Sequence, residues 1–283
     1  MNQKNHNLNP HEPKLGSFIA LYKSLIKNRQ LILHMTKRDV ISRYRGSIIG
    51  LAWSFFNPIF MLSVYTIVFS LIFKAKWSVD EGENKIQFAL ILFTGMIVLN
   101  LFSEVLNRAP GLILSNVNYV KKVVFPLEIL PVVSLCVALF HASVSFLVLI
   151  IAFVVFNGYF NLSTFLIPII ILPFLILLLG ISWTLASLGV FIRDVGQTIG
   201  LLTTLLMFLS PVFYPISAVP EKLKPFILAN PMTFIIEQLR LSVIWDKPIN
   251  WTGLSIYLII AILFLFVGFA WFQKTRKGFA DVI

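Results

Sequence analysis

The chain alternates long uncharged apolar runs with short polar connections. The first apolar run extends from Gly46 to Phe73 and directly follows a basic segment, TKRDVISRYR. An α-helix rises about 1.5 Å per residue, so a run of this length crosses the roughly 30 Å hydrocarbon core of a bilayer with some tilt. The pattern therefore predicts a transmembrane helix. Its N-terminal end is expected in the cytoplasm, because basic residues are enriched on that side.

Later apolar runs predict further spans. The uncharged stretch from Ile129 to Ile192 is too long for one helix, and Asn157 and Gly158 mark the break within it. The later spans are expected at Ile86–Ser103, 127–156, 163–191, Gln197–Leu209 and Pro248–Phe272. We thus predict an all-α integral membrane protein with six transmembrane helices within residues 46–272.

The segments outside this domain are polar or amphipathic. Residues 1–16 are predicted to form a mobile polar tail, and residues 273–283 a cytoplasmic tail. Residues 17–45 carry apolar side chains at helical spacing, with basic side chains off the apolar face. This pattern is typical of an amphipathic interfacial helix that lies on the cytoplasmic membrane surface.

The segment 211–245 is unusual because it holds five prolines yet remains half apolar. The prolines exclude one continuous helix, and the apolar content excludes a free polar loop. We expect short, partly re-entrant helices at the outer leaflet, since non-helical backbone at membrane depth must be covered by protein or line a wet cavity. Elsewhere, Gly46 and Gly50 have a spacing that lets helices approach closely. Trp77, in the first outer connection, is expected to be an interface anchor.

Composition and charge agree with a membrane protein. Hydrophobic residues make up 58% of the chain and charged residues 12%, which excludes an ordinary soluble domain. Sixteen of the 23 Lys and Arg residues fall in segments predicted to be cytoplasmic, whereas the acids divide evenly between the two sides. This bias places both termini in the cytoplasm. The net charge of +11 therefore belongs to membrane-flanking positions, and we expect no nucleic acid partner.

Motifs for catalysis and nucleotide binding are missing from the sequence. It contains no GxxxxGK[ST], GxSxG, HExxH or CxxC pattern, so we expect no enzyme activity, metal site or cofactor in this chain. Few acids lie within the spans, which disfavours a proton-coupled carrier. Glu104 and Arg108 have the spacing of a helix salt bridge, and His141 is expected to be a neutral, hydrogen-bonded structural residue. Glu128 is expected to complement the dipole at the start of the third span.

Four segments resemble the permease subunits of polysaccharide- and polyol-phosphate-exporting ABC transporters of the type-2 group. They are RDVISRYRGSIIGLAWSFFNPIF, SNVNYVKKVVFPLEILP, LSPVFYPISAVPEKLKPFILANPMTFIIEQLR and FQKTRKGFADVI. The resemblance covers nearly the whole chain. It implies a multi-pass homodimer in the bacterial cytoplasmic (inner) membrane, docked on a separate subunit that binds ATP and Mg. It also implies export of a lipid-linked glycan: O-antigen first, or capsule or teichoic acid.

This resemblance suggests three sets of site residues. The residues expected to line the channel and contact the glycan are Trp53, Phe56, Asn57, Phe60, Thr204 and Phe208. Those expected to hold the pyrophosphate or headgroup of the lipid carrier are Lys37, Arg38, Arg43 and Arg45. Those expected to dock the ATPase are Asn116, Asn118, Tyr119, Lys121 and Lys122.

Simpler interpretations stay open for these sets. The aromatic residues can be packing or lipid-facing groups, because the chain has 27 Phe residues. The basic residues can be ordinary membrane anchors. Two other functions also remain open: an ABC exporter of a drug or small lipid, and a membrane-embedded transferase acting on a lipid-linked sugar. A transferase would need converging acids or histidines, whereas Glu104, Glu128, His141 and Asp194 are scattered along the sequence.

Overall fold

The computed structural model describes residues 18–72, 77, 85–121 and 125–283. The predicted tail of 1–16 and Lys122 lie outside the described residues. Within the described ranges the regular elements are all helical, which confirms the all-α part of the predicted fold class. The helices are α1 (Phe18–Lys27), α2 (Arg29–Arg43), α3 (Trp53–Tyr65), α4 (Lys85–Arg108), α5 (Val117–Val120), α6 (Ile129–Asn157), α7 (Ile167–Phe191), α8 (Val195–Phe208), α9 (Lys224–Ala229), α10 (Pro231–Val243), α11 (Trp251–Thr275) and α12 (Phe279–Val282).

Five helical stretches are long and apolar enough to cross a membrane. They are Gly50–Phe69, Ile86–Gly111, Ile129–Asn157, Leu162–Phe191 and Trp251–Val282. These confirm five of the six predicted spans. The predicted fifth span corresponds to α8, whose 14 residues reach only about 21 Å at the usual helical rise. By its own length α8 therefore falls short of the hydrocarbon thickness.

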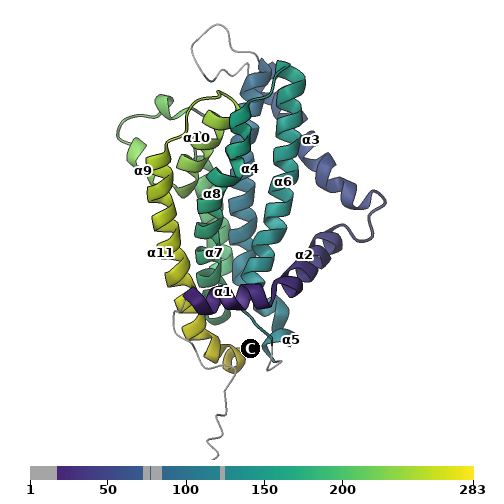
Figure 1. The fold of residues 1–283 in the computed structure, drawn as a ribbon, viewed down its shortest axis with the longest axis vertical. Coiled ribbons are helices and arrows are strands. Elements are labelled where there is room, and N and C mark those ends of the chain that lie inside the picture. The colour runs from purple at the N-terminus through teal and green to yellow at the C-terminus, as the bar shows by residue number, and fades with distance from the viewer. Residues whose placement is uncertain (1–17, 73–76, 78–84, 122–124) are drawn as a thin grey trace, which may run out of the picture.

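The spans differ in how much of their surface the chain covers. The most apolar window of Ile86–Gly111 is 83% buried, whereas that of Gly50–Phe69 is only 22% buried. In Figure 1, α4 runs through the middle of the bundle beside α6, while α3 leans away from it at the right. The first span therefore presents most of its side chains outward, and α4 forms the centre of the main core.

A second apolar core lies at the end of the bundle where α1 crosses it (Figure 1). It joins the N-terminal helices to the C-terminal end of the chain, because Leu21 of α1 and Phe279 of α12 belong to the same buried cluster. Trp183 of α7 is fully buried there and packs edge-on against Phe269 of α11, with ring centroids 5.1 Å apart. This end of the molecule is therefore one packed unit.

Helices α7 and α11 approach each other through glycines. A Cβ placed on Gly180 would lie 2.5 Å from the carbonyl oxygen of Phe264, and one on Gly268 would clash with the carbonyl oxygen of Gly180. Backbone atoms cannot move aside as a flexible side chain would. Gly180 and Gly268 are therefore the small residues that let α7 and α11 pack closely.

The proline-rich segment forms short helices, as predicted. It contains a 3₁₀ turn at Ile216–Ala218 followed by α9 and α10, and α10 packs against α4 and α7. Asn230 holds the start of α10, because its Oδ1 accepts a hydrogen bond from the Met232 amide at 3.0 Å while its Nδ2 donates to Ser210 Oγ at 2.9 Å. A side-chain cap thus lets the chain begin α10 directly after α9 ends.

A buried arginine satisfies the backbone where α8 ends. Arg240 of α10 is fully buried and donates to the carbonyl oxygens of Ile91 at 3.2 Å, Pro211 at 2.7 Å and Val212 at 3.1 Å. Its guanidinium also lies 4.3 Å from the ring centre of Trp77. Trp77 is itself buried, so the predicted interface anchor is wrong: the indole is a cation–π partner inside the bundle.

The connection into the first span also differs from the sequence prediction. Gly46 and Gly50 have φ values of +87° and +58°, and a Cβ on either would meet nothing within 4 Å. They are therefore turn residues that redirect the chain between α2 and α3, and not a helix-packing pair. The predicted helix of residues 17–45 is divided at Asn28 into α1 and α2.

Candidate functional site

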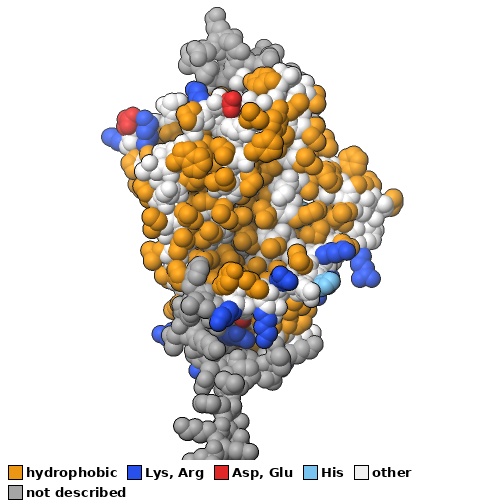
Figure 2. All heavy atoms as spheres, in the orientation of Figure 1, with side chains coloured by type: hydrophobic (Ala, Val, Ile, Leu, Met, Phe, Trp, Pro, Cys, Tyr) orange, Lys and Arg blue, Asp and Glu red, His pale blue; other side chains and the backbone are white. Residues whose placement is uncertain are grey.

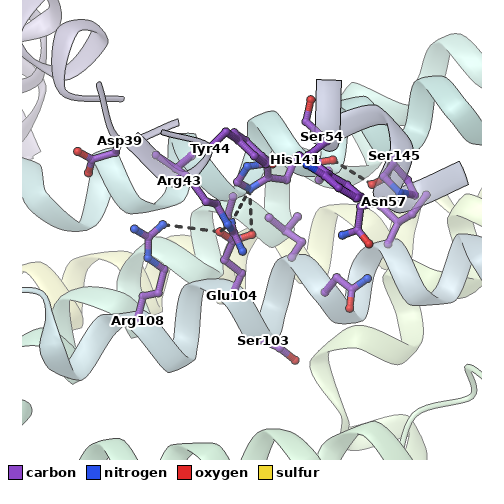
Figure 3. A pocket seen from close by; sticks show the side chains of 18 of the residues that line it. Asp39, Arg43, Tyr44, Ser54, Asn57, Ser103, Glu104, Arg108, His141 and Ser145 are labelled. Atoms are coloured by element: carbon purple, nitrogen blue, oxygen red, sulfur yellow. Dashed lines mark hydrogen bonds and ion pairs between the residues drawn. The ribbon is translucent and has the colours of Figure 1, made fainter. Parts of the chain in front are cut away.

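A cleft of about 1100 Å³ lies between the end of α2, the following turn, and helices α3, α4 and α6. Figure 3 shows side chains from these elements converging on it. Its polar and charged lining residues are Asp39, Ser42, Arg43, Tyr44, Arg45, Ser47, Trp53, Ser54, Asn57, Asn100, Ser103, Glu104, Asn107, Arg108, His141 and Ser145. A cleft with this many polar groups beside a membrane span is suited to a polar ligand.

Glu104 is the centre of the charges in this cleft. Its Oε1 lies 2.6 Å from Arg43 Nη1 and 3.6 Å from Arg108 Nη1, and its side chain is only 17% exposed. The predicted pair with Arg108 is thus present, but the shorter contact is to Arg43. That contact joins the end of α2 to α4 across 61 positions of sequence. The carboxylate is shared by two arginines, so the cleft keeps an excess of positive charge.

His141 of α6 completes this group (Figure 3). Its Nδ1 lies 3.0 Å from Arg43 Nη1 and 3.2 Å from Glu104 Oε2. One ring nitrogen accepts a hydrogen bond from arginine only when it is unprotonated, and donates to a carboxylate only when it is protonated. In any one protonation form, this nitrogen therefore makes only one of the two contacts as a hydrogen bond. The Nε2 atom is buried without a hydrogen-bond partner in the described part of the chain.

Two of the predicted glycan-contacting residues on α3 line the cleft, namely Trp53 and Asn57. Trp53 is 45% exposed and its Nε1 donates to Ser47 Oγ at 2.9 Å, which fixes the indole over the turn that enters α3. Phe56 and Phe60 do not line the cleft and are 53% and 66% exposed. Within one chain these two rings lie on the outer surface of α3.

The two predicted contact residues on α8 also lie apart from the cleft. The Thr204 hydroxyl donates to the Gly200 carbonyl of its own helix at 3.0 Å. Phe208 is 64% exposed and borders a separate apolar groove of about 450 Å³, formed with Tyr214 and Phe226 among others. The structure of a single chain therefore does not bring the α3 and α8 residues to one site.

The four predicted headgroup residues divide in the same way. Arg43 and Arg45 line the cleft, whereas Lys37 and Arg38 do not. Arg38 instead donates to the Tyr119 hydroxyl at 3.1 Å and pairs with Asp39 at 3.0 Å. The hydrogen bond to Tyr119, followed by that to Asp39, raises the pKa of Arg38 above its ordinary value. Arg38 thus connects α2 to the segment predicted to dock an ATPase.

That segment contains α5 and the residues around it. Tyr119 stacks on Phe125 with ring centroids 4.2 Å apart, and Asn116 Nδ2 donates to the Leu112 carbonyl at 2.8 Å. Asn118 and Lys121 are exposed. The segment therefore has a fixed inner side and exposed polar groups on its outer side.

Comparison with known proteins gives the family. The sequence profile of the ABC-2 type transporter family matches residues 30–244, which extend from α2 to the end of α10. The chain belongs to the ABC-2 type transporter family. The matched region includes the cleft, Arg240 and the α5 segment.

Several curated relatives match this ABC-2 type transporter along most of their length. The O-antigen export system permease protein RfbA of Klebsiella pneumoniae is 26% identical over 254 residues, covering 89% of this chain and 95% of that protein. RfbA of Myxococcus xanthus is 25% identical over 267 residues, covering 94% and 100%. The polysialic acid transport protein KpsM of Escherichia coli is 23% identical over 245 residues, covering 85% and 92%.

Sequence reasoning missed the group around Glu104 in this ABC-2 type transporter. Local spacing showed only the pair with Arg108, because Arg43 and His141 are distant in sequence. It also missed Arg240, whose partners are mostly backbone carbonyls and leave no sequence pattern. Within the described residues no three His, Cys, Asp or Glu side chains come together in a way that could hold a metal ion.

Proposed function

We propose that this ABC-2 type transporter is the channel-forming subunit of an exporter for a lipid-linked polysaccharide in a bacterial cytoplasmic (inner) membrane. The observation that carries the proposal is the near full-length similarity to relatives named for export of O-antigen and transport of polysialic acid. O-antigen is the first candidate, because the two RfbA proteins are 26% and 25% identical to this chain, against 23% for KpsM. A separate cytoplasmic subunit binds ATP and Mg and supplies the energy.

The proposed topology has six membrane crossings and both ends of the chain in the cytoplasm. Helices α1 and α5 and the C-terminus lie at one end of the bundle in Figure 1, and Lys and Arg side chains gather near that end in Figure 2. This arrangement supports a cytoplasmic position for that end, with α1 and α2 at the membrane surface. Helix α8 crosses together with the turn that follows it, and α9 and α10 form re-entrant helices at the outer side.

The proposed path for the glycan lies between two copies of the chain. Exposed aromatic residues on α3 and α8, such as Phe56, Phe60 and Phe208, lie on surfaces that one chain leaves uncovered. In a homodimer these surfaces face the second copy and line the path together with Trp53 and Thr204. Aromatic rings contact the C–H faces of sugars without holding a strong charge, so a long chain can slide along them.

The basic end of the cleft is proposed to hold the pyrophosphate of the lipid carrier. Arg43 and Arg45 line the cleft at the membrane-flanking end of α3, with Lys37 and Arg38 on the preceding helix. Arginine presents a planar fork of donors that fits phosphate oxygens in pairs. Because Glu104 already pairs with Arg43 at 2.6 Å, an entering diphosphate competes with this carboxylate for the guanidinium.

Replacing Trp53 by alanine is expected to reduce glycan export by about two- to tenfold while the protein level stays unchanged. An aromatic contact contributes about 0.5–1.5 kcal/mol, and 1.4 kcal/mol corresponds to about tenfold in rate. Surface glycan and membrane protein are quantified in the same cells. Phe60→Ala is expected to act in the same direction. The matched control is Trp251→Ala on α11, where Trp251 is 54% exposed but lies outside the cleft.

Export that falls only in proportion to protein level would show that Trp53 is a packing residue. Equal losses for Trp53→Ala and Trp251→Ala would likewise contradict the proposed path, because Trp251 lies on α11, outside the α3 and α8 surfaces that form the path. Normal export in both Trp53→Ala and Phe60→Ala would show that these aromatic residues do not line the glycan path.

A photo-crosslinker at position 118 is expected to capture the cytoplasmic ATP-binding subunit. Asn118 is exposed on α5, and the proposed topology places this segment on the cytoplasmic side. The same probe at Ser217, exposed near α9 on the proposed outer side, serves as the control and is expected to capture nothing from the cytoplasm. Labelling of position 118 by an impermeant reagent added outside the cell would contradict both the docking site and the topology.

A further inference from the structure

Glu128 connects distant parts of the chain at the end of the bundle where α1 lies. Its Oε1 accepts a hydrogen bond from Ser24 Oγ of α1 at 2.8 Å. Its Oε2 accepts one from Arg276 Nη1 at 2.9 Å, in the 3₁₀ turn Arg276–Gly278 between α11 and α12. One carboxylate therefore bonds to the N-terminal helix and to the C-terminal end of the chain, with 104 and 148 positions of sequence between the partners.

The pair of Glu128 and Arg276 is largely shielded from water. Their side chains are 9% and 14% exposed. Removing one partner of a buried ion pair leaves the other charge uncompensated, so such a pair keeps its elements together as long as both charges remain. Ser24 adds a neutral hydrogen bond from the other direction.

The backbone of Glu128 is held separately from its side chain. Its carbonyl oxygen accepts a hydrogen bond from Trp183 Nε1 at 3.0 Å, and Trp183 is fully buried. The neighbouring Leu127 and Ile129 are buried in the same apolar core. A change of the Glu128 carboxylate therefore leaves the start of α6 anchored. Mutation of Glu128 can thus test the role of its side chain separately from the position of the helix.

Arg276 also connects this group to the segment around α5. Arg276 Nη2 donates to the Phe125 carbonyl at 3.4 Å, and Phe125 stacks on Tyr119 of α5 at 4.2 Å. Tyr119 in turn accepts a hydrogen bond from Arg38 of α2 at 3.1 Å. Figure 1 shows α1, α5 and the C-terminus together at this end. The α5 segment is thus connected to both terminal parts of the chain.

We propose that Glu128 is a positioning residue for transport, which makes α1, the α5 segment and the C-terminal end of the chain move as one unit. The inference rests on the proposed docking of the ATP-binding subunit at the α5 segment. A displacement of that segment then reaches α1 through Ser24 and α11 through Arg276. Packed elements with specific bonds transmit a displacement because they shift together between discrete arrangements.

The test uses the complete transporter, with its ATP-binding subunit, in lipid vesicles. Glu128→Gln keeps the shape of the side chain and removes its charge. The expected result is normal binding of the ATP-binding subunit and ATP hydrolysis within about twofold of wild type, but about tenfold less glycan moved per ATP, a factor that corresponds to 1.4 kcal/mol. Ser24→Ala, which removes one neutral hydrogen bond, is expected to give a smaller loss of about two- to threefold.

Two further variants distinguish coupling from simple stability. Glu128→Gln combined with Arg276→Gln also removes the bond of Arg276 to the Phe125 carbonyl, so it is expected to recover none of the lost glycan per ATP. Recovery would show that the uncompensated Arg276 charge caused the loss, and would overturn the inference. The matched control is Glu221→Gln, because the Glu221 side chain is 86% exposed and pairs only with Lys224 in the described structure. This control is expected to transport as wild type does.

Unchanged glycan per ATP in Glu128→Gln would overturn the inference, whether or not the amount of protein falls. If Glu128→Gln yields no folded protein, unchanged glycan per ATP in Ser24→Ala overturns it instead. Failure of the proposed function gives a different result. In that case wild-type protein itself shows no crosslink from position 118 or moves no glycan, before any Glu128 variant is compared.

Discussion

Replacing Arg240 by methionine is expected to destabilise the protein strongly. The fully buried guanidinium supplies hydrogen bonds to three backbone carbonyls and a contact with Glu237 at 2.9 Å. Carbonyls left buried without partners cost about 1–3 kcal/mol each. For the three carbonyls we expect a total loss of about 3–9 kcal/mol, visible as a drop of roughly 10 °C in the melting temperature of detergent-purified protein.

The matched control for Arg240 is Glu237→Gln. It removes the charge that faces Arg240 but leaves the bonds to Ile91, Pro211 and Val212 in place. Its side chain is 28% exposed, so its loss is expected to cost about 1 kcal/mol or less. A melting temperature of Arg240→Met equal to that of wild type would show that the proline-rich segment holds its position without this arginine.

Replacing Gly268 by alanine is expected to separate α7 from α11. The added Cβ would clash with the carbonyl oxygen of Gly180, and the obstacle is backbone, so one helix must shift. Overpacking of this kind costs about 1–3 kcal/mol, and the favourable helix propensity of alanine offsets only about 0.5–1 kcal/mol of it. The measurement is the melting temperature of the purified protein, with Gly268→Leu expected to prevent folding.

Gly200→Ala gives the matched control for this prediction. Gly200 lies within α8, and a Cβ there would meet nothing within 4 Å. Its replacement is expected to leave the melting temperature unchanged or slightly raised. Similar losses at positions 200 and 268 would contradict the close α7–α11 contact, because the substitution would then act through helix propensity alone.

The spans were predictable because hydropathy is a local signal. The break at Asn157 and Gly158 was predictable because glycine favours the left-handed conformation that ends many helices. In the structure Gly158 adopts this conformation at the end of α6, with φ of +76°. The glycine pair before the first span was misinterpreted for the opposite reason. The spacing of Gly46 and Gly50 fits helix packing, but only backbone geometry shows that both residues have positive φ and form a turn.

The candidate site was predictable in part. Arg43 and Arg45 before the span were recognised separately from Trp53 and Asn57 within it. The structure joins these four residues in one cleft through the turn after α2, whereas Lys37 and Arg38 lie outside it. The partners of Glu104 were not predictable, because Arg43 and His141 come from other helices. In a single chain Phe56 and Phe60 lie exposed on the outer surface of α3. Their proposed contact with a second copy depends on the geometry of the dimer, which the local sequence pattern does not encode.

The most direct test of this account is ATP-driven movement of a lipid-linked glycan by the purified transporter. The chain and its ATP-binding subunit are reconstituted in vesicles with the cytoplasmic face outward, and a labelled lipid-linked glycan is supplied on that face. The account predicts that ATP makes the glycan resistant to an added glycosidase, and that this protection is lost without either subunit. ATP hydrolysis with no protection of the glycan, or with movement of a small lipid instead, would contradict it.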